Sequence, residues 1–281
     1  MKIVRSVSKM AALAGQYRRK GIRVAFVPTM GALHEGHLSL VLAARNVSDV
    51  VVASIFVNPI QFGPKEDFRK YPRTLREDAR LLSRAGTDVL FFPDAQDMFP
   101  VGFATRVSVR GLADSLCGRF RPGHFEGVAT VVAKLFAIVG PHIAFFGQKD
   151  YQQCKVIERM TLDLNLGVKI RMMPVVREAD GLAMSSRNRY LSGEQRAIAA
   201  RLFHALSNAR RSFWKGNKDS RVLKNKAIKE LRTGGIQNIE YVEIVQADTL
   251  EPLKQVQRPA VIAVAVRVGA TRLIDNVFLA K

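Results

Sequence analysis

The chain has 281 residues, of which 48% are hydrophobic and 24% charged, a composition typical of a globular protein with one large or two ordinary domains. No apolar run reaches the roughly 18 residues that a membrane-spanning helix needs. The first residues also lack the apolar region of a secretory signal. These features exclude collagen-like, wholly disordered and membrane-spanning proteins, and they predict a cytoplasmic one.

The net charge of +20, from 44 basic and 24 acidic residues, indicates either an anionic partner or a lineage whose proteins are basic. Basic residues are densest from Arg210 to Arg232, which suits a nucleic-acid or membrane-surface patch, or the solvated side of two helices. No aromatic ladder accompanies them, so we favour the second interpretation and expect no specific nucleic acid and no membrane as partners. The two cysteines, Cys117 and Cys154, fit neither a disulfide framework nor a zinc site, and we interpret them as partly buried thiols.

Short apolar runs alternate with helical patterns over the first two thirds of the chain. This alternation predicts β-α-β units and therefore a Rossmann-like α/β fold with a parallel sheet. Ligands of such sheets bind beyond the carboxyl ends of the strands, so the loops that follow the strands are the candidate site. The expected strands are residues 22–27, 50–57, 89–92 and 142–146, and the expected helices are residues 36–46, 74–85, 127–139 and 151–162.

The pattern changes after a further apolar run at residues 168–176. We therefore predict two domains, a Rossmann-like ligand-binding domain over residues 1–176 and a smaller α+β domain over residues 177–281. In the second domain, helical patterns at residues 193–214 and 220–233 precede apolar runs at residues 239–245, 260–266 and 272–279.

The loop after the first strand contains a His-x-Gly-His motif at the start of a helix, formed by His34, Gly36 and His37. A helix N-terminus presents unpaired amides and a partial positive charge to an anion. Gly36 permits close approach of the backbone, and the two imidazoles add donors for phosphate oxygens. Either histidine alone would more often be structural, but together they predict a nucleotide phosphate site without a Walker lysine. The zinc-protease pattern His-Glu-x-x-His is absent.

The loop after the second strand offers neutral amides. Asn58 and Gln61 supply directional hydrogen bonds, although amides also cap turns routinely, so a structural role stays open. Residues 63–73, which follow, are flanked by glycine and proline and lack an apolar period, which favours a lid. Residues 117–125 form a glycine-broken basic loop before a helix, for which structural and functional roles are equally open.

Two further polar loops supply charge for a nucleotide. Lys149 is a point charge for phosphate, and Asp150 suits a helix cap, a magnesium ligand or a ribose contact. Ser185, Ser186 and Arg187 suit a triphosphate, although serine-rich loops are usually turns. No Ser-His-Asp or Cys-His arrangement stands out, so we expect catalysis by positioning and by charge stabilisation rather than by a covalent enzyme nucleophile.

Five segments occur in the order and at the spacing of one known family: PTMGALHEGHLSLV, SIFVNPIQFGPKEDFRKYPRT, CGRFRPGHFEGVATVVAKLF, FFGQKDYQQ and MSSRNRYLS. With them, residues 25–195 resemble the pantothenate synthetase (pantoate-β-alanine ligase) family of coenzyme A biosynthesis. The His-x-Gly-His motif alone indicates only the broader group of nucleotidyl-transferases and class I aminoacyl-tRNA synthetases. Residues 196–281 carry weaker signatures, consistent with a C-terminal lid domain.

The resemblance implies that the carboxylate of (R)-pantoate attacks the α-phosphate of ATP-magnesium, and that β-alanine then attacks the adenylate to give pantothenate and AMP. It also implies a homodimer without an organic prosthetic group, with Mg²⁺ held mainly by the ATP phosphates and Asp150 as a candidate ligand.

His37 would be the proton donor, and we add His34 and Lys149 as catalytic residues. Pantoate and β-alanine would contact Asn58, Gln61 and Gln153. ATP would contact Met30, Gly31, Ala32, Leu33, His34, Glu35, Gly36, His37, Gly147, Gln148, Lys149, Asp150, Val176, Met184, Ser185, Ser186 and Arg187.

One position departs from the family pattern, because Gln148 stands where the family often has Glu. If this position contributes to the ATP site through its backbone, the site loses nothing. If the site requires the carboxylate, that group is missing. Two other functions stay open at this point: a nucleotidyltransferase that stops after transfer to a phosphate acceptor, and a basic nucleic-acid-binding module. AMP formation that depends on pantoate and β-alanine separates the ligase from the former, and steep salt dependence of nucleic-acid binding would support the latter.

Overall fold

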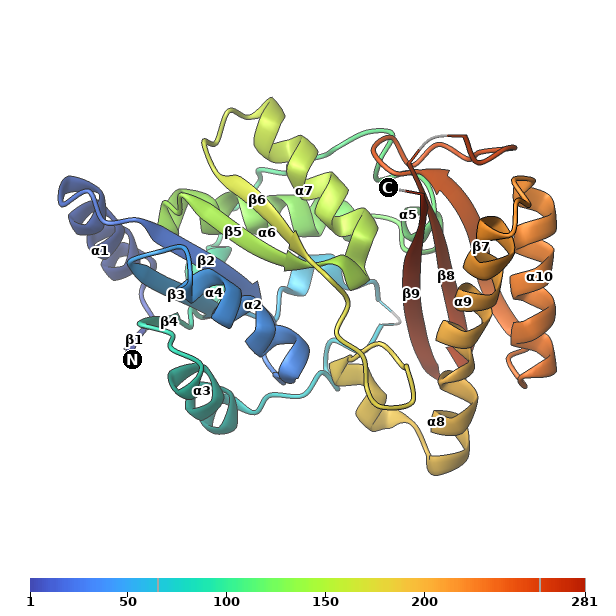
Figure 1. Cartoon of the computed structure of the whole chain (residues 1–281). Coiled ribbons are helices and arrows are strands. Elements are labelled where there is room, and N and C mark those ends of the chain that lie inside the picture. The colour runs from blue at the N-terminus through green and yellow to red at the C-terminus, as the bar shows by residue number, and fades with distance from the viewer. Residues whose placement is uncertain (65, 258, 281) are drawn as a thin grey trace. The chain divides into compact units, whose positions relative to one another are not determined.

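The computed structural model describes residues 1–64, 66–257 and 259–280. The chain divides into two units (Figure 1). Among the residues described, no helix is long and apolar enough to cross a membrane. Lys65, inside the predicted lid segment, lies outside the described residues. The first unit comprises Met1–Ala113, Arg121–Gly147 and Gln153–Pro174, and the second comprises Asp114–Phe120, Gln148–Gln152 and Val175–Lys281.

The first unit contains a six-stranded sheet in the order β1-β4-β3-β2-β5-β6, in which every pair of neighbouring strands is parallel. From β2 the chain proceeds outward to β3 and β4 on one side, while β5 and β6 lie on the other. The strand order therefore reverses beside β2, which is where doubly wound sheets bind ligands. The strands are β1 (Lys2–Val4), β2 (Val24–Thr29), β3 (Val50–Ile55), β4 (Val89–Phe91), β5 (Ile143–Gly147) and β6 (Lys169–Met173).

Side chains of the central strands alternate between two apolar layers, as buried parallel strands require. On one face, Val27 and Ala53 join a core with Val41 of α2 and Leu82 of α3. On the other face, Phe26 meets Phe136 of α6 edge to face, with ring centroids 6.4 Å apart, and α1 contacts α6. The longer helices are α1 (Val7–Arg19), α2 (Glu35–Arg45), α3 (Leu75–Arg84), α6 (His124–Val139) and α7 (Tyr151–Asp163), with short turns η1 (Pro59–Gln61) and α4 (Ala95–Met98).

The second unit contains a three-stranded antiparallel sheet in the order β7-β8-β9. Two helices pack on it, α9 against β9 and α10 against β7 (Figure 1). Leu206, Leu223 and Val264 are fully buried in the core that they share. The elements are η2 (Gln148–Asp150), η3 (Ser186–Tyr190), α5 (Cys117–Phe120), α8 (Gly193–Ala199), α9 (Arg201–Trp214), α10 (Ser220–Thr233), β7 (Asn238–Gln246), β8 (Ala260–Val268) and β9 (Thr271–Ala280).

The parallel sheet with helices and the small antiparallel sheet confirm the predicted α/β fold class with an added α+β part. Two local predictions were incomplete. Residues 193–214 form two helices that meet at Ala200, because α8 packs toward β8 and α9 along β9. Strand β1 and helix α1 were not predicted, since β1 has only 3 residues and α1 buries only Met10 and Ala14.

Candidate active site

The loop after β2 is held in a tight turn. The hydroxyl of Thr29 donates to the carbonyl of Ser54 at 2.7 Å and accepts the N–H of Gly31 at 3.1 Å. Gly31 and Ala32 both adopt the left-handed conformation, with φ of +82° and +50°, which favours glycine. A Cβ on Gly31 would lie 3.0 Å from Cγ2 of Ile55. The backbone conformation and the limited space both favour glycine at this position.

A buried carboxylate fixes the next part of the same loop. Asp78 of α3 is 1% exposed, and it accepts the N–H groups of Ala32 at 3.0 Å and Leu33 at 2.8 Å. The hydroxyl of Thr74 donates to it at 3.1 Å. Sequence reasoning missed this residue. The signal was present, because Asp78 lies on the buried face of α3 with Leu82, where an acidic side chain needs hydrogen-bond partners.

The two histidines of the motif lie at the N-terminus of α2. His34 is the N-cap residue in extended conformation, and its side chain makes no capping hydrogen bond. His37 lies in the first turn, and the two ring centroids are 4.1 Å apart with the planes inclined by 37°. The N–H groups of Glu35 and Gly36, the first of α2, have no carbonyl partner within the helix, whereas that of His37 donates to the carbonyl of His34 at 2.8 Å. Two imidazoles and a positive helix end thus follow the carboxyl end of β2, beside which the strand order reverses. This arrangement is suited to an anionic ligand.

Gln61 lies in η1, directly after β3, with 8% of its surface exposed. Its Nε2 contacts Sδ of Met30 at 2.9 Å, and its Oε1 accepts the amide of Asn58 at 3.0 Å. Asn58 is buried, and it also donates to the carbonyl of Gly127 at 3.0 Å. Asn58 therefore orients Gln61. A direct contact between Asn58 and substrate stays a prediction.

The backbone around Gln61 is also braced. The carbonyl of Gln61 lies 2.8 Å from Nδ1 of His124, and Arg121 lies 2.9 Å from the other nitrogen of that ring. Arg121 binds both carboxylate oxygens of Glu66 at 2.6 Å. A Cβ on Gly127 would lie 2.3 Å from the carbonyl oxygen of Ile60. Part of the loop at residues 117–125 thus acts structurally beneath Gln61, a long-range role that its sequence left open.

The Glu66 carboxyl shows the balance of burial and charge in this brace. Burial is the largest influence and raises its pKa, but the hydrogen bonds and charge of Arg121, the Gly63 N–H and the charge of His124 outweigh burial. The net effect is a lowered pKa. The ionised Glu66 carboxylate is therefore the form that the fold stabilises.

Strand β5 ends at Gly147, and η2 follows it directly. In the second unit, Asn276 of β9 donates to the carbonyls of Gln148 at 2.9 Å and Lys149 at 3.0 Å. The side chain of Gln148 donates back to Oδ1 of Asn276 at 3.1 Å. The Lys149 ammonium lies 3.7 Å from the carboxylate of Asp150. Asn276 thus fixes the backbone that carries Lys149, another contact that no sequence signal indicated.

Helix α7 carries the second predicted substrate amide. The side chain of Gln153 makes no hydrogen bond to any residue that the structure describes, and it is half-buried. The preceding Gln152 is buried, and it accepts the N–H of Cys117 at 2.9 Å and donates to the carbonyl of Ser115 at 2.7 Å. Cys117 and Cys154 form no disulfide and are buried, more deeply than the sequence suggested.

The serine-rich loop is ordered by its own hydrogen bonds. The carbonyl of Val176 accepts the N–H of Met184 at 3.0 Å, and Oγ of Ser185 accepts the N–H of Arg187 at 3.3 Å. The buried Asn188 donates to Glu178 at 2.7 Å. Ser186 and Arg187 form the first turn of η3. The second unit therefore presents two hydroxyls and a guanidinium on one short, braced segment.

Metal ligands are sparse in the part of the chain that the structure covers. No group of three or more His, Cys, Asp or Glu side chains there is arranged to hold a metal ion. The Asp150 side chain is 45% exposed beside Lys149. Mg²⁺ bound to a nucleotide needs only one or two carboxylates in addition to phosphate, so Asp150 fits a supporting ligand.

Comparisons with known proteins agree with the segments in the sequence. The family model described as pantoate-beta-alanine ligase matches residues 2–278. The pantothenate synthetase of Thermotoga petrophila is 50% identical over 279 residues, which cover 99% of this chain and 100% of the relative. That of Pelotomaculum thermopropionicum is 50% identical over 281 residues, which cover both chains completely.

Two solved structures are similar over almost the whole chain. A pantothenate synthetase from Thermus thermophilus has a TM-score of 0.95 at 46% identity and covers 100% of both chains. A pantoate-beta-alanine ligase from Francisella tularensis, complexed with beta-gamma ATP and beta-alanine, has a TM-score of 0.82 at 33% identity and covers 99% of this chain and 98% of that one. The motif at α2, the fold and these matches agree, and the chain belongs to the pantoate-β-alanine ligase family.

Proposed function

We propose that this ligase condenses (R)-pantoate with β-alanine through a pantoyl adenylate. In the first step a carboxylate oxygen of pantoate bonds to the α-phosphorus of ATP, and the bond to pyrophosphate breaks. In the second step the amine of β-alanine attacks the acyl carbon, AMP leaves, and the amine loses a proton. The observation that carries this proposal is the pair of imidazoles at the N-terminus of α2, beside the strand where the sheet order reverses.

The catalytic side chains act by stabilising charge. His34 and His37 donate to phosphate oxygens beside the positive end of α2, and Lys149 places an ammonium on the negative charge that grows as pyrophosphate leaves. Their geometry supports this role, because the rings lie 4.1 Å apart and Asn276 fixes the backbone of Lys149. Asp78 holds the loop that leads into α2.

Pantoate is held by neutral amides. An Arg fork on its carboxylate would stabilise the ground state and reduce nucleophilicity, whereas amide N–H groups orient the substrate without neutralising it. Gln61 is fixed by Asn58 and by its braced carbonyl. The Gln153 side chain makes no hydrogen bond to the described residues, so it would lose none when pantoate binds. We assign both to pantoate, with Gln61 also near β-alanine.

The remaining ATP contacts that we propose lie between the end of β2 and the first turn of α2, from the end of β5 into η2, and in and before η3. Mg²⁺ would be held mainly by the ATP phosphates, with Asp150 as a supporting ligand, and it would neutralise phosphate charge. We further propose that residues 1–176 and 177–281 act as a catalytic domain and a lid domain, and that the enzyme works as a cytoplasmic homodimer. The remaining ATP-contact residues are Met30, Gly31, Ala32, Leu33, Glu35, Gly36, Gly147, Gln148, Val176, Met184, Ser185, Ser186 and Arg187.

An omission assay tests the function. AMP and pantothenate are measured by chromatography after incubation with ATP, Mg²⁺, pantoate and β-alanine, and then with each substrate omitted in turn. We expect both products only when all three substrates are present. Steady AMP release without pantoate would reject the ligase, and pyrophosphate release that needs another phosphate acceptor would favour a nucleotidyltransferase.

A further inference from the structure

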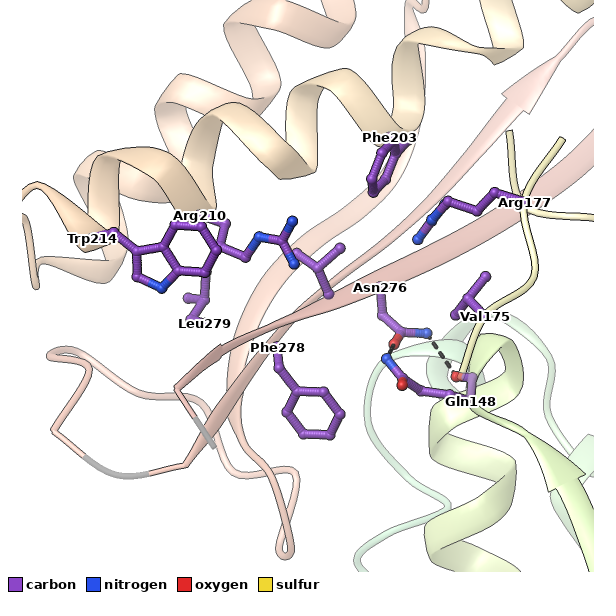
Figure 2. Close-up of a pocket in the computed structure, with 10 residues that line it drawn as sticks. Gln148, Val175, Arg177, Phe203, Arg210, Trp214, Asn276, Phe278 and Leu279 are labelled. Carbon is purple, nitrogen blue, oxygen red and sulfur yellow. Dashed lines mark hydrogen bonds between the residues drawn. The ribbon is translucent and has the colours of Figure 1, made fainter. Parts of the chain in front are cut away.

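The second unit contains a pocket of about 480 Å³ between α9 and β9. Figure 2 shows its lining: Phe203, Arg210 and Trp214 project from α9, Asn276 and Phe278 come from β9, and Arg177 approaches from the segment after β6. The lining therefore combines aromatic rings with two guanidinium groups. Gln148, which we assign to ATP, also lines this pocket, but neither the family match nor the proposed reaction assigns a ligand to the part between Arg210 and Trp214.

One of the two guanidinium charges is compensated within the protein. Arg177 donates to both carboxylate oxygens of the buried Asp275, at 2.6 and 3.0 Å, and to the carbonyl of Gly181 at 3.1 Å. Its guanidinium carbon lies 3.8 Å from the ring centroid of Phe203. Arg177, which is paired with Asp275, thus adds no net charge to the wall of the pocket.

The second charge is not compensated. The guanidinium of Arg210 lies 4.9 Å from the ring centroid of Trp214, and no ion pair joins it to any residue that the structure describes. The Nε atom of Arg210 is buried and has no hydrogen-bond partner among the residues that the structure describes. A buried donor without an acceptor costs free energy, so an anion with acceptor oxygens would relieve this cost and neutralise the charge.

Aromatic surface is available beside this charge. Trp214 is 65% exposed, which is unusual for a large aromatic side chain. Its burial against a ligand would remove apolar area from water. In Figure 2 the ring of Phe278 also borders the same space. A ligand that carries both an anionic group and a flat apolar group would satisfy these neighbouring features together.

We propose that this pocket is a binding site for a small aromatic anion, with its acidic group on Arg210 and its ring system against Trp214. The proposal does not rest on the ligase reaction, because neither Arg210 nor Trp214 has a part in it. Trp214 is the chain's only tryptophan, so its fluorescence reports occupancy of this site directly.

The test uses 8-anilinonaphthalene-1-sulfonate, an aromatic sulfonate that accepts energy from tryptophan, titrated into the full-length folded protein. We expect saturable quenching of Trp214 with one site by calorimetry. Arg210→Gln should weaken binding by about 10-fold or more, because it removes a charge-assisted contact. Arg210→Lys, which keeps the charge, should retain most of the affinity. Melting curves for each variant establish that it is folded.

The matched control is Arg211→Gln. Arg211 follows Arg210 on α9, is exposed and hydrogen-bonds Asn208, so its loss changes the net charge equally without touching the pocket. Affinity should be unchanged in this variant. The proposal is overturned if both Gln variants bind alike, if the uncharged N-phenyl-1-naphthylamine binds as tightly as the sulfonate, or if ATP displaces the probe competitively, which would assign the pocket to the nucleotide.

Discussion

Replacement of Asp78 by Asn tests how the loop between β2 and α2 is held. The carboxylate accepts three hydrogen bonds, from the N–H groups of Ala32 and Leu33 and from the hydroxyl of Thr74. Asn keeps the shape but offers one oxygen, so its NH₂ group faces a backbone donor that loses its acceptor. A buried unsatisfied donor costs about 1–3 kcal/mol, and relief from burying a charge offsets part of the loss. We expect a net destabilisation of about 2 kcal/mol.

Urea unfolding and steady-state kinetics measure the two consequences of Asp78→Asn. The loop leads into the first turn of α2, so its displacement should also lower kcat/KM for ATP, by about 10- to 100-fold. Glu77→Gln is the matched control, because Glu77 is the neighbouring, exposed acid on α3, and it should change stability by less than about 0.5 kcal/mol. The reasoning is refuted if the two variants share the same unfolding midpoint and the same kinetics for ATP.

Three further predictions concern charge and hydrogen bonding in the site. His37→Ala and Lys149→Ala should each lower kcat by about 100- to 1000-fold, the usual loss for a donor to transition-state charge; folded variants with near-normal kcat would remove these residues from the catalytic set. Gln61→Glu should weaken pantoate by about 100-fold or more in calorimetry, because a like charge replaces an amide donor, while ATP binds normally; unchanged pantoate affinity would contradict the assignment. The folded-state pKa of Glu66 is lowered, with burial outweighed by Arg121, so the stability that this pair contributes is present above the ordinary glutamate pKa of about 4.3 and is lost as pH falls through the lower folded pKa. Unfolding measured from pH 7 to 3 should therefore be less steeply acid-sensitive in Glu66→Gln; equal slopes would disprove the coupling.

Much of the fold could be predicted because its signals are local. Apolar runs marked the central strands, and the His34–His37 motif stood where a strand ends and a helix begins. Short or weakly apolar elements such as β1 and α1 were not predicted. The helical pattern of residues 193–214 also could not reveal that α8 and α9 meet at Ala200, because that break follows from how each helix packs on the sheet.

The supports of the site were harder to predict because they join distant parts of the chain. Asp78 lies 45 residues from Leu33, whose N–H it accepts, and Asn276 lies 127 residues from the Lys149 carbonyl. For Asp78 a sequence signal existed, an acid on the apolar face of a helix. For Asn276 no such signal exists, since an amide on a strand can take many partners and only the fold selects one.

The proposed mechanism requires that ATP activates pantoate before β-alanine reacts, without a covalent intermediate on the enzyme. Exchange of labelled pyrophosphate into ATP, measured with ATP, Mg²⁺ and pantoate but no β-alanine, tests this order of steps. We predict that exchange requires pantoate, proceeds without β-alanine and persists in Cys117→Ala and Cys154→Ala. Exchange that occurs only when β-alanine is added would contradict the stepwise mechanism.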